Sequence, residues 1–392
     1  NASYGDVART TLDYMLAEMQ GEHGGFFSSQ DADSEGEEGR FFVWKRAEFD
    51  SVLGADAEFA ARCYGVSVDG NWEHTNVLYA AREPVAVARE LGLDESAAAA
   101  RLDRARQALK AVRDRRVAPG TDDKVLAAWN GLAIAACARG YQVLGDRRWL
   151  TAAQRAAGFV LERMQRDGRL LRSWHSGRAQ HAAYLEDHAF VADALLTLYE
   201  SDFDPRWLAA ARSQLDAIRT RFRDPADGNL WFTADDHERL LARSRSISES
   251  STPSGLAIAV RAFARAGLLL GDEELYAIAD RAMHANAAVL MQEPVACPSL
   301  VAAWQFLCGD PREVVIAGEL EDERTQAMLR RLRTTAGRPH VVLVVTAAQR
   351  ATLEGLSTTV VDKQQVRGVP TAYVCRRGAC EAPITDPEKF WR

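Results

Sequence analysis

The sequence lacks any long apolar run, because no stretch approaches the roughly 18 residues that a membrane-spanning helix needs. It also lacks an excess of basic residues, since it has 48 Lys and Arg against 55 Asp and Glu. Nucleic acid and anionic membranes both bind best to a basic face, so neither is expected as a partner. The first twenty residues contain no basic stretch followed by an apolar one, and no signal peptide is predicted.

Several motifs with well-understood chemistry are absent too. There is no Gly-x-x-x-x-Gly-Lys-Ser/Thr phosphate loop, no strand-linked Gly-x-Gly-x-x-Gly, no His-Glu-x-x-His and no Gly-x-Ser-x-Gly. The acidic stretch 31–42 matches the start of an EF-hand loop but has Phe42 where a bidentate glutamate is required. We therefore predict neither a cofactor nor a metal ion.

The six cysteines are scattered and include no Cys-x-x-Cys pair. Cys63, Cys137 and Cys308 lie within apolar helical patterns, where we expect buried free thiols. Cys375 and Cys380 flank a predicted hairpin and could form a cross-strand disulfide, but free thiols are the preferred interpretation. This cysteine usage indicates a reducing, cytoplasmic compartment.

What the sequence does contain is the composition of a globular protein, with 392 residues of which 47% are hydrophobic and 26% charged. That length allows a large core, as one big domain or as a main domain with an appendage. The chain begins without Met and enters almost directly into a helical pattern. We therefore expect it to be part of a longer protein.

A helical pattern repeats through the middle of the chain. Each repeat contains an apolar helix, a turn with an aspartate and an amphipathic helix, and the turns fall at Asp146, Asp204 and Asp272. A helix that is apolar all round is typically buried, whereas one with a polar stripe faces solvent. Stacked pairs of inner and outer helices predict an (α/α) barrel, in which the loops that enter the inner helices meet at one mouth.

The two ends of the chain follow other patterns. Near the start we expect a helix over 3–20, a β-hairpin formed by 24–31 and 39–44 around the acidic loop, two short helices within 45–65 and a charged helix over 94–116. Beyond residue 310, three strand-like segments and a helix over 323–335 predict a small α/β appendage. The expected domains are thus a barrel over 1–310 and an appendage over 311–392.

Four polar clusters should meet at the barrel mouth. They are the acidic loop with Trp44 behind it, "TDDKVLAAWNG", "WHSGRAQHAAYLEDHAF" and "SISESSTPSG". Helix capping is a competing interpretation for Asp122, Asp123, Glu186 and Asp187, since acids are favoured at helix N-termini. The third cluster is the densest, and its carboxylate next to an imidazole suits general acid–base chemistry.

Tryptophans in or beside these clusters, together with carboxylates, suit the apolar faces and hydroxyls of sugar rings, although core packing is the alternative. The candidate residues are, for catalysis, Asp187, His188, Asp33, Glu35 and His175, and for substrate binding Asp31, Trp44, Asp123, Lys124, Trp129, Asn130, Trp174, Tyr184, Glu186 and Glu249.

Five motifs together resemble the spermatogenesis-associated protein 20 / YyaL family: "GGFFSSQDADSEGEEGRFFVW", "DDKVLAAWNGLAIAA", "AYLEDHAFVADALLTLYE", "PSGLAIAV" and "AYVCRRGACEAPITDPEKF". The resemblance implies a mainly α fold, an (α/α)6 toroid similar to N-acylglucosamine 2-epimerases and six-hairpin glycosidases, with a sugar-related cavity. Members of the family usually carry an N-terminal thioredoxin-like domain, which this chain lacks and which is expected as a partner in the full-length protein.

Three functions stay open at this point. A sugar epimerase or isomerase needs two proton-transfer groups, for which His175, His181 and His188 are available. A glycoside hydrolase needs two carboxylates, for which Asp33 or Glu35 could act with Asp187. The third function is a non-catalytic sugar- or peptide-binding scaffold for a thioredoxin-like domain.

Overall fold

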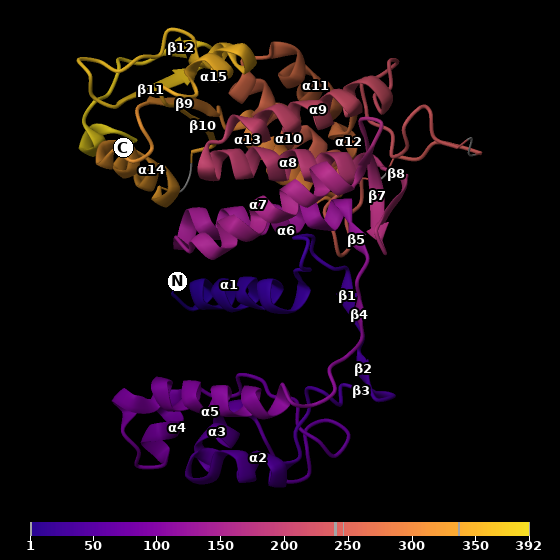
Figure 1. Ribbon diagram of the computed structural model, residues 1–392, viewed down its shortest axis with the longest axis vertical. Coiled ribbons are helices and arrows are strands. Elements are labelled where there is room, and N and C mark those ends of the chain that lie inside the picture. Colours follow the sequence, from indigo (N-terminus) through magenta and orange to yellow (C-terminus); the bar gives the residue numbers. More distant parts are fainter. Residues whose placement is uncertain (1, 239–240, 246, 336–337, 392) are drawn as a thin grey trace. The chain divides into compact units, whose positions relative to one another are not determined.

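The structure is a computed structural model that describes residues 2–391 apart from 239–240, 246 and 336–337 (Figure 1). The chain divides into two compact units, the first comprising Asn1–Ser28 with Asp123–Arg392 and the second Ser29–Asp122. The division predicted from the sequence, into 1–310 and 311–392, follows a different boundary and stays a prediction.

Three helical hairpins follow one another in the first unit. They are α6 (Ala127–Leu144) with α7 (Arg147–Arg163), α8 (Leu185–Asp202) with α9 (Pro205–Arg221), and α10 (Gly255–Leu270) with α11 (Glu273–Ala285). The side chains of Asp146, Asp204 and Asp272 each accept a hydrogen bond from the backbone N–H two residues later and so cap the second helix. The three predicted turn positions are confirmed.

The first helices of the hairpins are the inner ones. Helix α6 packs on α8, α8 on α10, and α10 on α13 (Pro298–Cys308), while α1 (Ala2–Tyr14) packs on α6 (Figure 1). Nearly every residue of α8 is buried, whereas α7 and α9 bury one face only. This confirms the predicted class, a mainly α chain of the (α/α) toroid type.

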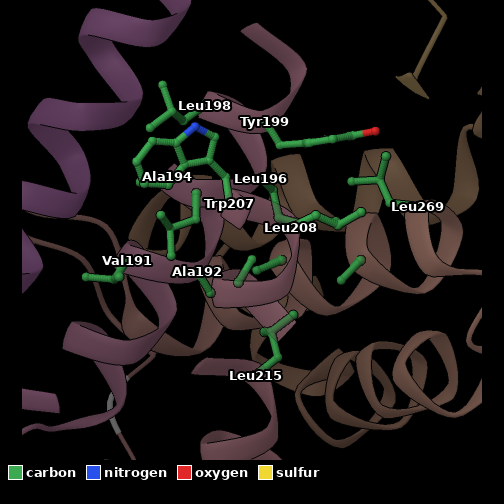
Figure 2. Close-up of a cluster of buried hydrophobic side chains, with 14 of the residues drawn as sticks. Val191, Ala192, Ala194, Leu196, Leu198, Tyr199, Trp207, Leu208, Leu215 and Leu269 are labelled. Carbon is green, nitrogen blue, oxygen red and sulfur yellow. The ribbon is translucent and has the colours of Figure 1, made fainter. Parts of the chain in front are cut away.

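The core between the hairpins is built from large side chains of neighbouring helices. Figure 2 shows Leu196 and Leu198 of α8 near Trp207 and Leu208 of α9, all of them buried. Burying one such leucine contributes about 1.5–3 kcal/mol. Close packing also depends on Gly131 of α6, because a Cβ added there would lie 2.6 Å from the carbonyl carbon of Phe190 in α8.

The C-terminal part of the first unit has the predicted α/β character. Its sheet has the order β10 (His340–Val345), β9 (Arg312–Ala317), β11 (Thr371–Arg376) and β12 (Ala379–Cys380). Strands β9 and β10 are parallel and connected through α14 (Glu323–Thr334), and α15 (Arg350–Leu356) follows β10. The predicted strands and the predicted helix are confirmed.

Two expectations for the cysteines are wrong. Cys375 and Cys380 form a disulfide with an S–S distance of 2.11 Å, because the β11–β12 register places the two residues directly opposite each other. Cys63 and Cys137 are buried free thiols as expected, but Cys308 is exposed. It is the last residue of α13, where the chain reaches the surface.

The second unit consists mainly of four helices, α2 (Arg46–Leu53), α3 (Ala57–Tyr64), α4 (Pro84–Glu90) and α5 (Ala98–Arg113). Strand β1 (Ser29–Gln30) pairs with β4 (Thr121–Asp122), so the two ends of this unit lie side by side. The predicted helices within 45–65 and 94–116 are confirmed.

The predicted hairpin around the acidic loop is wrong. The loop forms its own hairpin from β2 (Asp33–Ser34) and β3 (Glu37–Glu38). Glu35 and Gly36 connect these strands with positive φ angles of 53° and 79°. Two-residue hairpin turns of this kind require positive φ at both positions, and glycine meets that requirement without strain. The flanking aromatic segments pair elsewhere.

Within the part of the chain that the structure describes, no helix combines the length and the apolar character needed to cross a membrane.

Candidate functional site

One buried carboxylate links the N-terminal ends of two inner helices, α6 and α8. Asp187, in the first turn of α8, is fully buried. Its Oδ2 accepts a hydrogen bond of 2.9 Å from the N–H of Tyr184, and its Oδ1 accepts one of 3.1 Å from the N–H of Ala128 in α6. Asp187 therefore caps its own helix and the neighbouring one, which has no N-cap side chain of its own.

Arg172 neutralises this carboxylate from the strand β7 (Arg169–His175). Its Nη1 lies 3.2 Å from Asp187 Oδ2 and 2.9 Å from Glu186 Oε1. Burial raises the pKa of Asp187 to about 6, although Arg172 and the two backbone N–H groups favour the charged form. Glu186 is the more accessible acid of the pair, with 23% of its side chain exposed.

The same end of the first unit includes the starts of α10 and α13. A Cβ added at Gly255, the first residue of α10, would lie 3.0 Å from the Cα of Glu186. Glu249 accepts hydrogen bonds of 2.9 Å from both the N–H and the hydroxyl of Ser299 in the first turn of α13. The predicted meeting of the inner-helix starts is thus present for α6 with α8, α8 with α10, and the loop before α10 with α13.

Aromatic side chains surround these helix starts. Trp129 in the first turn of α6 is 45% exposed, and Trp174 on β7 is half-buried between Phe159 and His23. Tyr184, just before α8, stacks on two further rings, and the guanidinium of Arg172 lies 4.9 Å from its ring centre. An exposed indole at a helix start can hold the apolar face of an amphipathic ligand.

His175 and Asp123 form an imidazole–carboxylate pair in the first unit. Nε2 of His175, at the end of β7, lies 3.1 Å from Asp123 Oδ1, and both side chains are more than half exposed. Strand β5 (Val125–Leu126) pairs with β7, which brings the segment before α6 beside His175. Lys124 is exposed next to this pair, and its carbonyl accepts a hydrogen bond from Ser28 Oγ. An imidazole paired with a carboxylate can transfer protons near neutral pH.

Two of the candidate residues make structural contacts instead of facing solvent. Asn130 is 1% exposed, and its side-chain amide both accepts from the N–H of Phe26 and donates to its carbonyl. Trp44 is 2% exposed in the core of the second unit, where the guanidinium of Arg116 lies 4.1 Å from its ring centre. These contacts favour the packing interpretation for both residues.

His188 lies at a small pocket of about 160 Å³, whose lining includes His237 and Phe222. Its Nδ1 lies 2.9 Å from Oε1 of Gln214, and its ring makes an edge contact with Phe222. Burial lowers the pKa of His188 to about 4, against the effect of the Gln214 hydrogen bond. The imidazole is therefore neutral at pH 7.

This pKa predicts an acid sensitivity that one substitution should reduce. Between about pH 6.5 and pH 4 the unfolded chain binds a proton at His188 that the folded chain does not bind, so stability falls as the pH falls. His188→Asn, which keeps a donor for Gln214, should remove this contribution, and its free energy of unfolding should fall less than that of the wild type between pH 7 and pH 4.5. Urea unfolding at both pH values measures the difference.

The matched control is His181→Asn, because His181 is exposed and its positive φ of 61° suits asparagine. This variant should keep the acid sensitivity of the wild type. Equal acid sensitivity of wild type and His188→Asn would contradict the role of His188.

The acids of the loop belong to the second unit and are exposed. Asp31 accepts a hydrogen bond from the N–H of Asp33, and Glu35 lies 3.2 Å from Arg40. Among the described residues, no group of three or more His, Cys, Asp and Glu side chains is arranged to hold a metal ion. The pairing of Asp33 or Glu35 with Asp187 stays a prediction.

Three residues of the site were not foreseen, namely Arg172, Phe232 and His237. Arg172 stands in the strand-like run "GRLLRSW", where its charge among apolar residues was the only local signal. Phe232 and His237 come from the loop after α9, and the ring stack with Tyr184 depends on contacts between segments about fifty residues apart.

Comparison with known proteins supports the resemblance predicted from the motifs. Human spermatogenesis-associated protein 20 is 28% identical over 98% of this chain and 54% of its own length. An uncharacterised protein of Caenorhabditis elegans is 24% identical over 94% of this chain and 54% of its own length. The chain thus spans about half the length of the curated relatives it matches. No family model matches the sequence.

Solved structures with some similarity include two sugar-converting enzymes and a hydrolase. A sugar epimerase from a ruminal bacterium has 14% identity, a TM-score of 0.36 and 70% coverage of both chains. Cellobiose 2-epimerase from Bacillus thermoamylovorans has 11% identity and a TM-score of 0.37, covering 73% of this chain and 72% of its own. A GH76 α-mannanase from Bacteroides thetaiotaomicron has 16% identity and a TM-score of 0.39, covering 48% and 54%.

Proposed function

We propose that the first unit is a carbohydrate-active domain that binds a saccharide at the starts of its inner helices and acts on it by proton transfer, as a sugar epimerase or isomerase does. The observation that carries the proposal is the placement of the exposed Trp129. It follows Ala128, whose N–H donates to Asp187, and Glu186 immediately precedes that aspartate. An aromatic face and an accessible carboxylate therefore lie at the same helix ends.

The roles of the candidate residues follow from their exposure. The face of Trp129 would take the apolar side of a sugar ring, while Glu186 and Arg172 would bind its hydroxyls. His175, paired with Asp123, and Glu186 are the accessible groups that could give or take a proton. Asp187 would position Glu186 and Arg172 without contacting the substrate, because its side chain is fully buried.

Proton transfer is favoured over glycoside hydrolysis for a physical reason. A hydrolase needs two carboxylates that both reach the scissile bond. Of the adjacent pair in the first unit only Glu186 has solvent access, since Asp187 is enclosed by Tyr184, Ala128 and Arg172.

The proposal is tested by the binding of saccharides to two tryptophan variants. Trp129→Ala should weaken the binding of a saccharide by about tenfold, ~1.4 kcal/mol, because the stacking face is lost. Trp304→Ala is the matched control, because Trp304 is 47% exposed, against 45% for Trp129, and lies in the second half of α13 and not at its start. Isothermal titration with a panel of mono- and disaccharides measures the saccharide affinity of the wild type and of both variants. If no sugar of the panel binds, or if Trp304→Ala weakens binding as much, the site is wrong.

Turnover is tested separately with Glu186→Gln, which removes the charge and keeps the shape. We expect the variant to bind the sugar but not to exchange the hydrogen on the carbon next to the carbonyl group with deuterated solvent, as followed by NMR.

The second candidate function is a non-catalytic scaffold for a thioredoxin-like domain. It is favoured by the engagement of Asp187, Asn130 and Glu249 in structural hydrogen bonds. Binding of sugars by the wild type without any exchange or conversion would select this function.

A further inference from the structure

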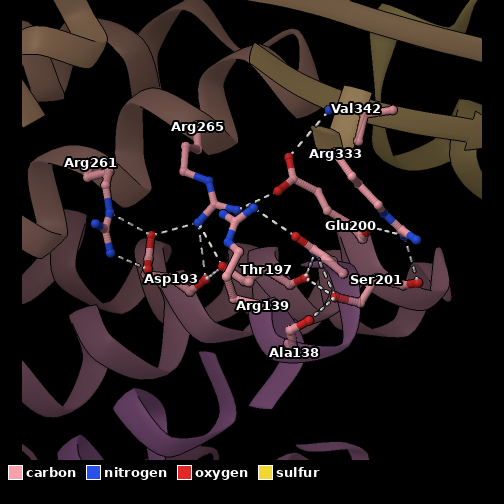
Figure 3. A network of polar contacts seen from close by, with 11 residues as sticks. Ala138, Arg139, Asp193, Thr197, Glu200, Ser201, Arg261, Arg265, Arg333 and Val342 are labelled. Atoms are coloured by element: carbon pink, nitrogen blue, oxygen red, sulfur yellow. Dashed lines mark hydrogen bonds and ion pairs between the residues drawn. The ribbon is translucent and has the colours of Figure 1, made fainter. Parts of the chain in front are cut away.

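Another cavity in the first unit lies away from the helix starts, beside the later halves of α6, α8 and α10. It has a volume of about 590 Å³ and is lined by residues of α6, α8, α10, α13, α14 and β10, several of which are drawn in Figure 3. Pockets for small organic ligands commonly measure about 300–1,000 Å³. The lining contains five arginines and only two carboxylates, although the chain as a whole has a net charge of −7.

Both carboxylates of the cavity are already paired. Asp193 of α8 accepts from Arg261 at 2.6 Å and from Arg265 at 2.7 Å, both on α10. Glu200 accepts from Arg265 at 2.7 Å and from the N–H of Val342 in β10 at 3.3 Å. Burial opposes the charge of Asp193, but the two guanidinium groups outweigh it and hold its pKa well below the usual range.

Two further arginines point toward the same cluster without a carboxylate of their own (Figure 3). Arg139 of α6 donates to Oε1 of Gln142 at 2.7 Å, and Arg333 of α14 donates to the carbonyls of Glu200 and Ser201. Across the described residues, neither guanidinium forms an ion pair within 4 Å. Desolvation by the surrounding protein lowers the pKa of Arg139. The charges of Glu200 and Asp193 oppose this shift, and those of Arg265 and Arg261 add to it.

The lining has more guanidinium groups than carboxylates, which favours a bound counter-charge. Arg139 is exposed and Arg333 is half-buried. Guanidinium groups that lie close together repel each other, and an anion between them would remove that repulsion. Arginine also presents its N–H groups as a planar fork that matches the oxygens of a phosphate or a carboxylate. The lining contains arginines but no lysine. This lining has the chemistry that an anion requires.

We propose that this cavity binds a small phosphate monoester, with the phosphate held by Arg139 and Arg333 and the organic part against the apolar side of the lining. A phosphate monoester carries about 1.5–2 negative charges at pH 7, which matches the uncompensated charge of the two arginines better than one carboxylate does. Phe306, Leu329 and Leu332 provide the apolar side. The ligand would bridge the helical hairpins and the C-terminal α/β part.

The test measures ligand binding to the full chain by isothermal titration at constant ionic strength. The probes are inorganic phosphate, glucose 6-phosphate, glucose and malonate. We expect saturable binding of glucose 6-phosphate, weaker binding of inorganic phosphate, and a loss of at least tenfold for both in Arg139→Gln and in Arg333→Gln. Arg139→Gln should fold normally, because Gln142 is the only hydrogen-bond partner of that side chain among the described residues.

Arg212→Gln is the control, because Arg212 is exposed on α9 and does not line the cavity. It should bind the phosphates as the wild type does. The proposal is overturned if neither phosphate binds, if Arg139→Gln and Arg333→Gln bind as tightly as Arg212→Gln, or if malonate binds as tightly as glucose 6-phosphate. Glucose has no phosphate group. Glucose binding that is weakened in Trp129→Ala but not in Arg139→Gln would therefore support the saccharide site at the helix starts and would not count as binding in the cavity.

Discussion

Replacing Arg265 with glutamine is expected to lower the free energy of unfolding by about 3–5 kcal/mol. The guanidinium of Arg265 bonds both Asp193 and Glu200, and all three side chains are less than 10% exposed. Without the arginine, two buried carboxylates would lose their shared partner, and burial makes an uncompensated charge costly. Chemical unfolding in guanidinium chloride at pH 7 measures the loss.

Arg261→Gln provides the comparison that separates burial from charge. Arg261 bonds Asp193 as well, but 36% of its side chain is exposed and Arg265 would still neutralise that carboxylate. The free energy of unfolding should therefore fall clearly less in Arg261→Gln than in Arg265→Gln. Equal effects, or an effect of Arg265→Gln below about 1 kcal/mol, the level typical of exposed ion pairs, would contradict a buried network centred on Arg265.

Replacing Gly131 with alanine is expected to lower the free energy of unfolding by about 2–3 kcal/mol, because the added methyl group overpacks a tight helix contact. The new Cβ would lie 2.6 Å from the carbonyl carbon and 2.7 Å from the oxygen of Phe190. These are backbone atoms inside α8, so they cannot turn away as a side chain would. The inner helices α6 and α8 would have to separate.

Gly158→Ala should have the opposite effect. Gly158 lies within α7, and the nearest atom to an added Cβ is a flexible carboxylate oxygen 4.0 Å away. Alanine should stabilise this helix by up to ~1 kcal/mol, since glycine has the lower helix propensity. Thermal and urea unfolding of the two variants give the comparison. A gain at both positions would show that α6 and α8 are not in close backbone contact.

Local chemistry explains which parts of the fold could be predicted from the sequence. Asp146, Asp204 and Asp272 mark helix starts because an aspartate side chain bonds the backbone two residues ahead, whatever the rest of the chain does. The buried character of α8 follows equally from its apolar periodicity. The C-terminal strands were readable as short apolar runs.

The site was less predictable because its contacts join distant segments. Capping was foreseen for Asp187, but its bond to Ala128 of another helix depends on how α6 and α8 pack. In the same way, Asp193 and Arg265 appeared as isolated charges in apolar helices. Their pairing across 72 residues is a product of the fold.

The β1–β4 pairing has a consequence for how this chain could be divided. Paired residues in adjacent strands lie about 5 Å apart, so the chain enters and leaves the second unit at nearly one point, between Ser29 and Asp122. A segment with adjacent ends has the form of an inserted module, which can be gained, exchanged or removed without stretching the chain that hosts it. The second unit, Ser29–Asp122, and the first unit that hosts it could therefore have separate histories.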